Sequence, residues 1–428
     1  MGRTVIGEVQ RDEESMVDRQ KLIPWWEQDV VNNSYVLVIG AGAIGNEVLK
    51  NLALIGIGHI FICDMDVIST SNLSRTVLFG KKDVGKYKAE IAAQRVREMS
   101  VCPDVEVDYF IGDIMHLLGN GVFRQFDVVI GCLDNYEART SVNKRCNLLK
   151  IPYVDGGIRE LGMSVSVFHY PQSSCWACSV SKKQLANEKM IRYSCDEKRK
   201  RFVEEKKAPT IQISTAVAGA LAVQEAVKIL HGMGQTQYGM KYYFEGLTNS
   251  FESIRIPRRD NCMYHNSYDK VETTHWTNQA VLGEFLEWVK EQNDGEEFYI
   301  DITGEHRFTF TGRCKTCGST IDFHKPDYLI YAEDYYCSDC IAKKDFQKGL
   351  SSSDEIVELR ASDERISHMT LEELGIAKGH IVTVRSCSED SKCRYYELTA
   401  DLPDVLGSLT VRESLIKNAS EQQRMIER

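Results

Sequence analysis

The sequence predicts an α/β protein. A Rossmann-like, mostly parallel sheet is expected at residues 17–268, followed by a C-terminal α+β region with an inserted zinc ribbon. First, an apolar run at residues 36–39 meets a Gly-x-Gly-x-x-Gly turn and a helix-like segment, which is typical of a nucleotide-binding βαβ unit. Second, apolar residues at helical spacing over 280–292 precede a strand-like stretch at 298–302. Third, two Cys-x-x-Cys pairs follow, separated by 19 residues.

The glycine turn predicts phosphate binding. Gly40 allows the tight turn, Gly42 lets the backbone approach a phosphate, and Gly45 completes the pattern. The following helix offers free N–H groups and a positive dipole end to that phosphate. Asp64 comes 19 residues after Gly45, where such folds place a carboxylate on a ribose hydroxyl. Nicotinamide and flavin enzymes share this pattern, so it does not identify the reaction.

Composition limits the class of protein. A chain of 428 residues predicts two or three domains, and a net charge of −10 disfavours a nucleic-acid binder. We find neither a run of 18 apolar residues nor a signal-peptide core, so we expect a soluble, cytoplasmic protein without a membrane span. The chain has 14 cysteines, and six of them form three Cys-x-x-Cys pairs. In a protein expected in the cytoplasm, such pairs indicate metal binding rather than disulfides.

Charged residues after Asp64 do not suit a dehydrogenase. Arg75 and Lys88 flank a polar loop, and Asp134 follows a strand expected at residues 126–130. An arginine fork and a lysine point charge suit the phosphates of ATP. A carboxylate at a strand end suits Mg²⁺, a hard cation that takes oxygen ligands. This set predicts nucleotidyl transfer.

These motifs resemble the adenylating domain of the MoeB/ThiF/HesA group and of the ubiquitin-activating enzymes. The resemblance covers residue 19 to about residue 265 and implies the ThiF/activating-enzyme fold, usually as a dimer. It rests on six motifs: Asp18-Arg19-Gln20, the glycine turn, Asp64-Met65-Asp66, Ser71-Asn72-Leu73-Ser74-Arg75, Gly85-Lys86-Tyr87-Lys88 and Asp134-Asn135.

The resemblance also implies roles for these residues. Asp64 would hold the ribose, Asp134 would hold Mg²⁺, and Arg19 would reach a γ-phosphate, often across the dimer interface. The other nucleotide-binding residues would be Asp66, Asn72, Arg75, Lys88 and Asn135. Each residue alone could equally be a surface charge or part of a structural ion pair. The chemistry implied is attack of a carboxylate on the α-phosphorus of ATP, with the C-terminal glycine of a small ubiquitin-like or sulfur-carrier protein as the attacking group.

A structural zinc site is expected within the adenylating domain. Cys175 and Cys178 form one pair, and Cys262 with His265 stands where the family has a second Cys-x-x-Cys. Cys₃His is an ordinary tetrahedral zinc set. The alternative is a degenerate site beside which His265 merely lies.

A nucleophilic cysteine is expected in the loop at about residues 179–209. Cys195 follows Cys178 by 17 residues, and the resemblance to ubiquitin-activating enzymes implies that it forms a thioester with the activated carboxyl group. Neighbouring basic residues would favour the thiolate. The alternative is an exposed, non-essential cysteine, since the loop lacks the Cys-Thr-x-Pro signature of some relatives.

The C-terminal part, residues 269–408, is expected to be an accessory domain, β-grasp-like by resemblance to ubiquitin-activating enzymes. A plain α+β domain is the alternative. A zinc ribbon at residues 312–342 would be inserted in it, with strand-like residues 328–331 between its cysteine pairs, and residues 351–354 read as a polar linker. Residues 1–16 and 409–428 read as a flexible start and a tail. The four expected ligands of the ribbon are Cys314, Cys317, Cys337 and Cys340.

We therefore predict a homodimeric enzyme that activates a ubiquitin-like protein with ATP and Mg²⁺, carries two structural Zn²⁺ ions and transfers the product to Cys195. A downstream conjugating-type carrier protein is a further expected partner; a nucleic acid or a membrane is not. Adenylation without a thioester and an inactive adaptor subunit are the alternatives, and an oxidoreductase is a remote third.

Overall fold

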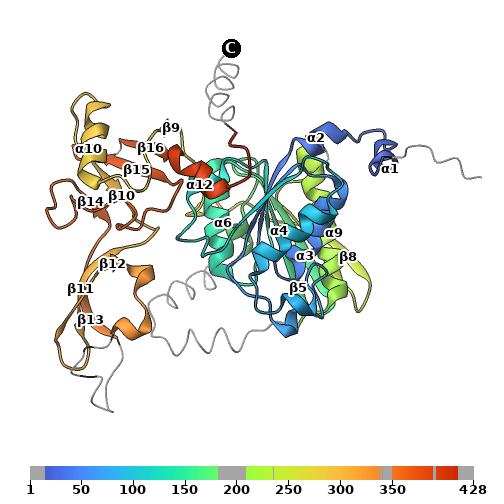
Figure 1. Ribbon diagram of the computed structural model, residues 1–428, viewed down its shortest axis with the longest axis horizontal. Helices are drawn as coiled ribbons and strands as arrows, with labels where there is room; N and C mark the ends of the chain where they lie inside the picture. The colour runs from blue at the N-terminus through green and yellow to red at the C-terminus, as the bar shows by residue number, and fades with distance from the viewer. Residues whose placement is uncertain are drawn as a thin grey trace, which may run out of the picture.

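The computed structural model describes residues 15–181, 209–234, 236–335, 337, 340, 349–388 and 392–412. Within them, the N-terminal domain is built on one eight-stranded sheet, and the C-terminal region adds a five-stranded and a three-stranded sheet (Figure 1). The predicted α/β sheet and the C-terminal α+β region are both confirmed.

The large sheet has the strand order β3-β2-β1-β4-β5-β6-β7-β8. The first five strands in this order are parallel, and β6, β7 and β8 are added antiparallel. From β1 the chain goes to β2 and β3 on one side, then returns to β4 on the other. The strands are β1 (Tyr35–Ile39), β2 (His59–Cys63), β3 (Glu106–Phe110), β4 (Val128–Gly131), β5 (Tyr153–Arg159), β6 (Gly162–Phe168), β7 (Met240–Glu245) and β8 (Ser250–Arg255).

Both faces of this sheet are covered by helices. One face forms a core with α3 (Ala43–Ile55), α4 (Lys88–Met99) and α9 (Gln212–Leu230). The other packs on α5 (Asn120–Phe123), α6 (Tyr136–Leu149) and α12 (Leu402–Leu406). Alternate residues of β1 enter opposite cores, and all five are buried, as expected for a central parallel strand. The N-terminal segment forms two short helices, α1 (Asp18–Lys21) and α2 (Gln28–Asn32). Three 3-10 turns lie at η1 (Thr70–Asn72), η2 (Lys81–Asp83) and η3 (Trp176–Ser179).

Helix α9 is the one described helix that is long and apolar enough to cross a membrane, with 19 residues and a mean hydropathy of 1.4. Half of its apolar window is buried inside the protein. Its small residues allow close approach to α3: a Cβ at Gly219 would lie 2.5 Å from Cβ of Glu47. A helix in the core of a protein can have the same length and apolar composition as a membrane span, so these two properties of α9 are weak evidence for a span.

The C-terminal region is an α+β unit with an insertion. Its five-stranded sheet has the order β14-β10-β15-β16-β9, and the aromatic face of α10 packs on it. The three-stranded sheet β12-β11-β13 lies between β10 and β14 in the chain, so the cysteine ribbon is inserted as predicted. The elements are β9 (Val271–Thr274), α10 (Leu282–Glu291), β10 (Phe298–Asp301), β11 (Phe308–Cys314), β12 (Thr320–Pro326), η4 (Asp327–Leu329), η5 (Ala332–Tyr335), β13 (Leu350–Ile356), β14 (Glu358–Leu359), β15 (Ile381–Ser386), β16 (Cys393–Leu398) and η6 (Thr399–Asp401).

Two local predictions in the ribbon are wrong. Residues 351–354, expected as a polar linker, lie within β13 and pair with β11. Residues 328–331, expected as a strand, overlap the 3-10 turn Asp327–Leu329 instead. Serines on an exposed outer strand look like a linker in sequence, because their pairing is set by the neighbouring strand and not by a buried face.

The C-terminal region is packed tightly on the N-terminal domain. Gly119 and Gly121 at α5 donate their N–H groups to the carbonyls of Lys378 and Gly379, at 3.1 and 2.9 Å. A Cβ at Gly119 would lie 2.3 Å from the backbone of Gly379, so there is no room for a side chain. After α12 the chain returns to the large sheet, where Arg412 pairs with an aspartate that precedes β4, Asp127, at 2.7 Å.

Candidate active site

The carboxyl ends of β1, β2 and β4 meet at one edge of the large sheet. The N–H of Gly40 donates to the carbonyl of Cys63 at 2.8 Å, and the N–H of Cys132 donates to that of Ile39 at 2.7 Å. The strand order reverses between β1 and β4, and open α/β sheets bind their ligands at such a switch point.

The three glycines of the turn meet different surroundings. Gly40 has a φ of 96°, and a Cβ there would lie 2.6 Å from the carbonyl oxygen of Cys132. Gly45 lies in α3, where a Cβ would come within 1.9 Å of the carbonyl oxygen of Gly40. Gly42, the N-cap of α3, has no atom within 4 Å of its Cβ position. The first and third glycines thus serve the fold, while the second faces open space at a helix N-terminus, which suits a phosphate.

Two acidic residues and a lysine lie beside this turn. Asp64 accepts hydrogen bonds from the N–H groups of Ala41, at 2.7 Å, and Asp66, at 2.8 Å. Burial raises the pKa of Asp64, opposed by the Lys88 ammonium and these N–H groups. Lys88 Nζ lies 2.6 Å from Oδ2 of Asp66. Since a carboxylate can accept about four hydrogen bonds, Asp64 keeps capacity for a ribose.

The loop after Asp66 carries Asn72 and Arg75. Asn72 caps a 3-10 turn, and Arg75 donates to the carbonyl of Ser71 at 2.7 Å, near the surface. Asn46, which was not predicted from the sequence, ties this loop to the glycine turn. Its side chain is fully buried, donates to the carbonyl of Ala41 at 2.7 Å and accepts from the N–H of Leu78 at 2.9 Å. The sequence carries no distinctive signal for this residue, because α3 contains three other polar residues, Glu47, Lys50 and Asn51.

Asp134 and Asn135 form the loop between β4 and α6. β4 ends at Gly131, so Asp134 lies three residues beyond the strand and not directly at its end. Its carboxylate is exposed, and Asn135 caps α6 by accepting from the N–H of Ala138 at 2.8 Å. An exposed carboxylate at the switch point is a suitable Mg²⁺ ligand.

Arg19 does not join this cluster within one chain. The neighbouring Gln20 donates to the carbonyl of Ile55, the last residue of α3, at 3.0 Å. The glycine turn lies at the first residue of this 13-residue helix, about 20 Å away at 1.5 Å per residue. Arg19 is exposed on α1, at the end of the N-terminal domain seen at the right of Figure 1.

Both predicted metal clusters come together. The four candidate ligand atoms in each set lie within 4.8 Å of one another. Sγ of Cys175 is 3.8 Å from Sγ of Cys178 and of Cys262, and Sγ of Cys178 is 3.3 Å from Nε2 of His265. Tetrahedral zinc with bonds of about 2.3 Å places sulfur ligands roughly 3.8 Å apart, so the spacing fits. The second cluster consists of Cys314, Cys317, Cys337 and Cys340.

The predicted nucleophile Cys195 lies outside the described residues, as do most of the loop around it and its basic neighbours. The described chain reaches residue 181 on one side of this loop and resumes at residue 209 on the other. The thioester step thus stays a prediction.

Comparison with known proteins decides the family. The sequence profile of the ThiF family matches residues 17–264. The chain belongs to the ThiF family.

Relatives of this ThiF-family chain cover different shares of it. A sulfur carrier protein adenylyltransferase of Thermus thermophilus is 30% identical over 240 residues, 55% of this chain and 83% of the relative. A SUMO-activating enzyme subunit 2 of Dictyostelium discoideum is 38% identical over 151 residues, 35% of this chain and 22% of the relative. The adenylyltransferase and sulfurtransferase MOCS3 of Drosophila persimilis is 27% identical over 233 residues, which are 54% of this chain and 48% of the relative. The chain thus spans less than half of the latter two.

Among solved structures, E. coli MccB with ATP matches at 24% identity and a TM-score of 0.47, over 56% of this chain and 68% of that one.

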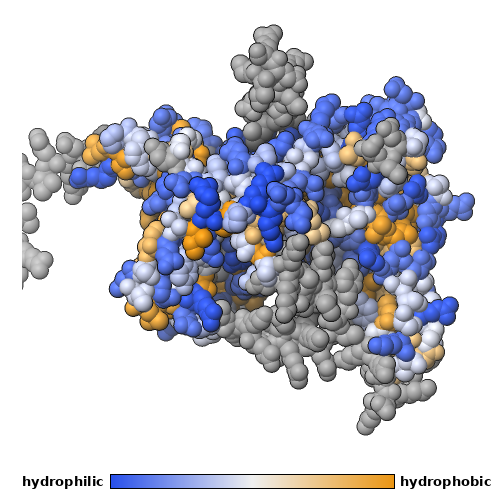
Figure 2. All heavy atoms as spheres, turned by 180° about the vertical axis from the view of Figure 1, so that it is seen from behind, coloured by the Kyte–Doolittle hydropathy of each residue, from blue (hydrophilic) through white to orange (hydrophobic). Residues whose placement is uncertain are grey.

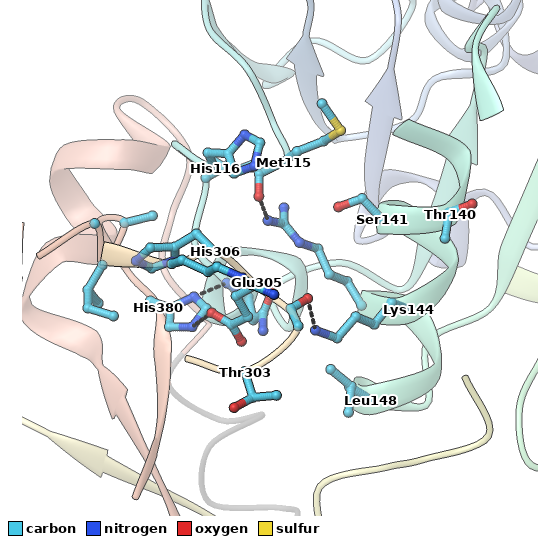
Figure 3. Close-up of a pocket in the computed structure, with 18 of the residues that line it drawn as sticks. Met115, His116, Thr140, Ser141, Lys144, Leu148, Thr303, Glu305, His306 and His380 are labelled. Carbon is cyan, nitrogen blue, oxygen red and sulfur yellow. Dashed lines mark hydrogen bonds and ion pairs between the residues drawn. The ribbon is translucent and has the colours of Figure 1, made fainter. Parts of the chain in front are cut away.

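A cavity of about 490 Å³ lies beside α6 between the ThiF domain and the C-terminal region (Figure 3). Lys144 of α6 bonds across this boundary, and two charged groups of the C-terminal region pair with each other beside it. Lys144 donates to the carbonyl of Gly304 at 3.2 Å, and Nε2 of His380 lies 3.1 Å from a carboxylate oxygen of Glu305. Burial alone would raise the pKa of Glu305, but His380 and Lys144 hold it below its usual value. These contacts make the cavity part of the joint between the two parts.

Proposed function

We propose that this protein adenylates the C-terminal glycine carboxylate of a small ubiquitin-like or sulfur-carrier protein with ATP. The supporting observation is the edge at the switch point. At this edge, the N-terminus of α3 at Gly42 faces open space. Asp64 and Lys88 lie on the β2 side of it, and the exposed Asp134 follows β4 on the other side. The names of the relatives from T. thermophilus and D. discoideum support the two substrate classes.

The proposed reaction needs little covalent chemistry from the protein. The carboxylate of the partner attacks the α-phosphorus of ATP, the bond to the bridging oxygen breaks, and pyrophosphate leaves. The N–H groups at Gly42 and the cations of Arg75 and Lys88 would neutralise phosphate charge. Asp64 would orient the ribose, with Asp66 holding Lys88 in place at 2.6 Å. Asp134 would hold Mg²⁺, which neutralises charge on the leaving pyrophosphate.

The finer proposal is a ubiquitin-like activating enzyme. The activated carboxyl group would pass to the thiol of Cys195 as a thioester, releasing AMP. A conjugating-type carrier protein would then accept it. Adenylation without a thioester is the second candidate, favoured by the resemblance over 83% of the length of the T. thermophilus sulfur carrier adenylyltransferase.

We also propose a homodimer. Gln20, the residue after Arg19, bonds to the end of α3 that lies about 20 Å from the glycine turn, so Arg19 would reach a γ-phosphate in the site of a second chain and not in its own. The surface offers apolar area for such a contact: a shallow groove of about 480 Å³ lies on α9 and β6–β8, with Phe251 57% exposed. Figure 2 shows further apolar side chains exposed among polar ones. Symmetric pairing of identical patches is the commonest assembly of such chains.

ATP–pyrophosphate exchange tests the adenylation. The purified chain should exchange labelled pyrophosphate into ATP only with Mg²⁺ and a β-grasp protein ending in glycine. Asp134→Ala should abolish exchange, while Asp404→Ala, which removes a 71% exposed carboxylate on α12, should leave it unchanged. Unchanged exchange in Asp134→Ala would remove the assignment of Asp134. Non-reducing gels with Cys195→Ala then separate the two candidates, because only a thioester enzyme gives a reductant-labile adduct that this variant lacks.

A further inference from the structure

The loop that carries Asp134 is bonded by an arginine, Arg139, that has no role in the proposed reaction. Arg139, in the first turn of α6, donates from Nε to the carbonyl of Leu133 at 3.1 Å, and its Nη2 donates to the same carbonyl. Nη2 also donates to the carbonyl of Gly156 in β5 at 2.9 Å. One guanidinium thus links the residue before Asp134 to the neighbouring strand.

A buried carboxylate fixes this guanidinium. Nη1 of Arg139 lies 2.7 Å from Oδ2 of Asp155, whose other oxygen accepts from the hydroxyl of Tyr153 at 2.8 Å. The side chains of Arg139 and Asp155 are only 17% and 5% exposed. Burial raises the pKa of Asp155, opposed by the attraction of Arg139. Arg139 therefore has one orientation, since turning it away would leave a buried carboxylate unpaired.

Asp134 is thus an exposed residue between two neighbours that are held by hydrogen bonds. Leu133 is held by Arg139, and Asn135 is held by its capping bond to Ala138. The geometry points to Arg139 as a positioning residue: we propose that its fork at Leu133 sets where the Asp134 carboxylate meets Mg²⁺. This inference rests on the proposed function. It needs a fork, because Arg139 reaches its three acceptors from three separate nitrogens, whereas a lysine that pairs with Asp155 would have to donate to both carbonyls from the same single nitrogen.

Arg139→Lys tests the fork while keeping the charge opposite Asp155. Helix α6 offers a matched control in Arg145, a second buried arginine. It donates to the carbonyls of Ile114 and Met115, away from the Asp134 loop. Arg145→Lys removes the same kind of fork from the same helix.

The first readout is metal binding, measured without turnover. Free Mn²⁺, standing in for Mg²⁺, is titrated by electron paramagnetic resonance against the full chain with a non-hydrolysable ATP analogue. Loss of a group that orients a metal ligand typically weakens metal affinity 10- to 100-fold. We expect Arg139→Lys to weaken Mn²⁺ binding at least about tenfold and Arg145→Lys less than about twofold. The second readout is exchange against Mg²⁺ concentration, where excess Mg²⁺ should restore the rate of Arg139→Lys.

Each outcome decides. Equal Mn²⁺ binding in wild type and Arg139→Lys, or the same loss in Arg145→Lys, would overturn the positioning role and leave the adenylation proposal intact. A wild type that shows neither metal binding nor exchange would overturn the proposed function itself. If Arg139→Lys does not fold, the double variant Arg139→Gln/Asp155→Asn removes both buried charges together and is titrated in the same way.

Discussion

Alanine at Gly42 and at Gly45 should separate nucleotide binding from folding. At Gly42 the backbone φ is −73° and the Cβ position is open, so alanine meets no steric conflict. We expect the free energy of unfolding to change by less than about 0.5 kcal/mol. The added methyl group would occupy the space through which a phosphate approaches the helix N-terminus, so ATP affinity should fall at least about tenfold, or 1.4 kcal/mol.

At Gly45 the added methyl group meets the backbone. Its position lies 1.9 Å from the carbonyl oxygen of Gly40, which cannot rotate away. Overpacking costs about 1–3 kcal/mol, and we expect the upper part of this range to remain after the gain of roughly 1 kcal/mol from replacing glycine in a helix. Gly45→Ala should therefore unfold at lower urea concentration even without nucleotide.

Urea unfolding with and without a non-hydrolysable ATP analogue measures both effects. At a ligand concentration 100 times its Kd, wild type should gain about 2.7 kcal/mol, and Gly42→Ala only about 1.4 kcal/mol after a tenfold loss of affinity. Gly42→Ala with wild-type ligand stabilisation would refute the phosphate role of the turn. A Gly45→Ala variant as stable as wild type would refute the steric argument.

Three further predictions concern metal, pH and assembly. Metal analysis should find two Zn²⁺ per chain and one in Cys337→Ser; one in wild type would mean that one cluster is not a zinc site. Burial raises the pKa of Glu397 to about 7 despite its ion pair with Arg124. Between about pH 4.5 and pH 7, the folded state therefore keeps a proton on Glu397 that the unfolded state has lost. This stabilisation is full below about pH 4.5 and is lost as pH rises through 7. The wild-type free energy of unfolding should therefore fall by about 2–3 kcal/mol more than that of Glu397→Gln between pH 5 and 8, and parallel curves in urea titrations would contradict it. Finally, Arg19→Ala and Asp134→Ala should each lack exchange, whereas their co-expressed mixture should recover about a quarter, since half of the dimers would be mixed, with one complete site; no recovery would argue against a shared site.

The sequence was sufficient to predict the sheet, because its patterns are local. The buried run before Gly40 and the glycine spacing report a strand, a turn and a helix without knowledge of the rest of the chain. The eight-stranded order was not readable, since antiparallel addition of β6 to β8 depends on contacts between distant segments. The cysteine clusters were predicted for the same local reason: ligand spacing within each pair is set by a short turn, so only the pairing of pairs needs the fold.

Side chains that would bind the nucleotide can be recognised in the sequence, whereas the side chains that position them cannot. Asp64, Lys88 and Asp134 are recognisable because a nucleotide demands particular chemistry at particular loops. Arg139 and Asn46 are not, because an arginine or an asparagine in a helix is ordinary until the fold places a partner opposite it. The partner of Arg139 is Asp155, 16 residues away in the next strand, and that of Asn46 is the N–H of Leu78, 32 residues away. Supporting contacts of this kind arise only from the parallel crossover connections, so they have to be read from the structure.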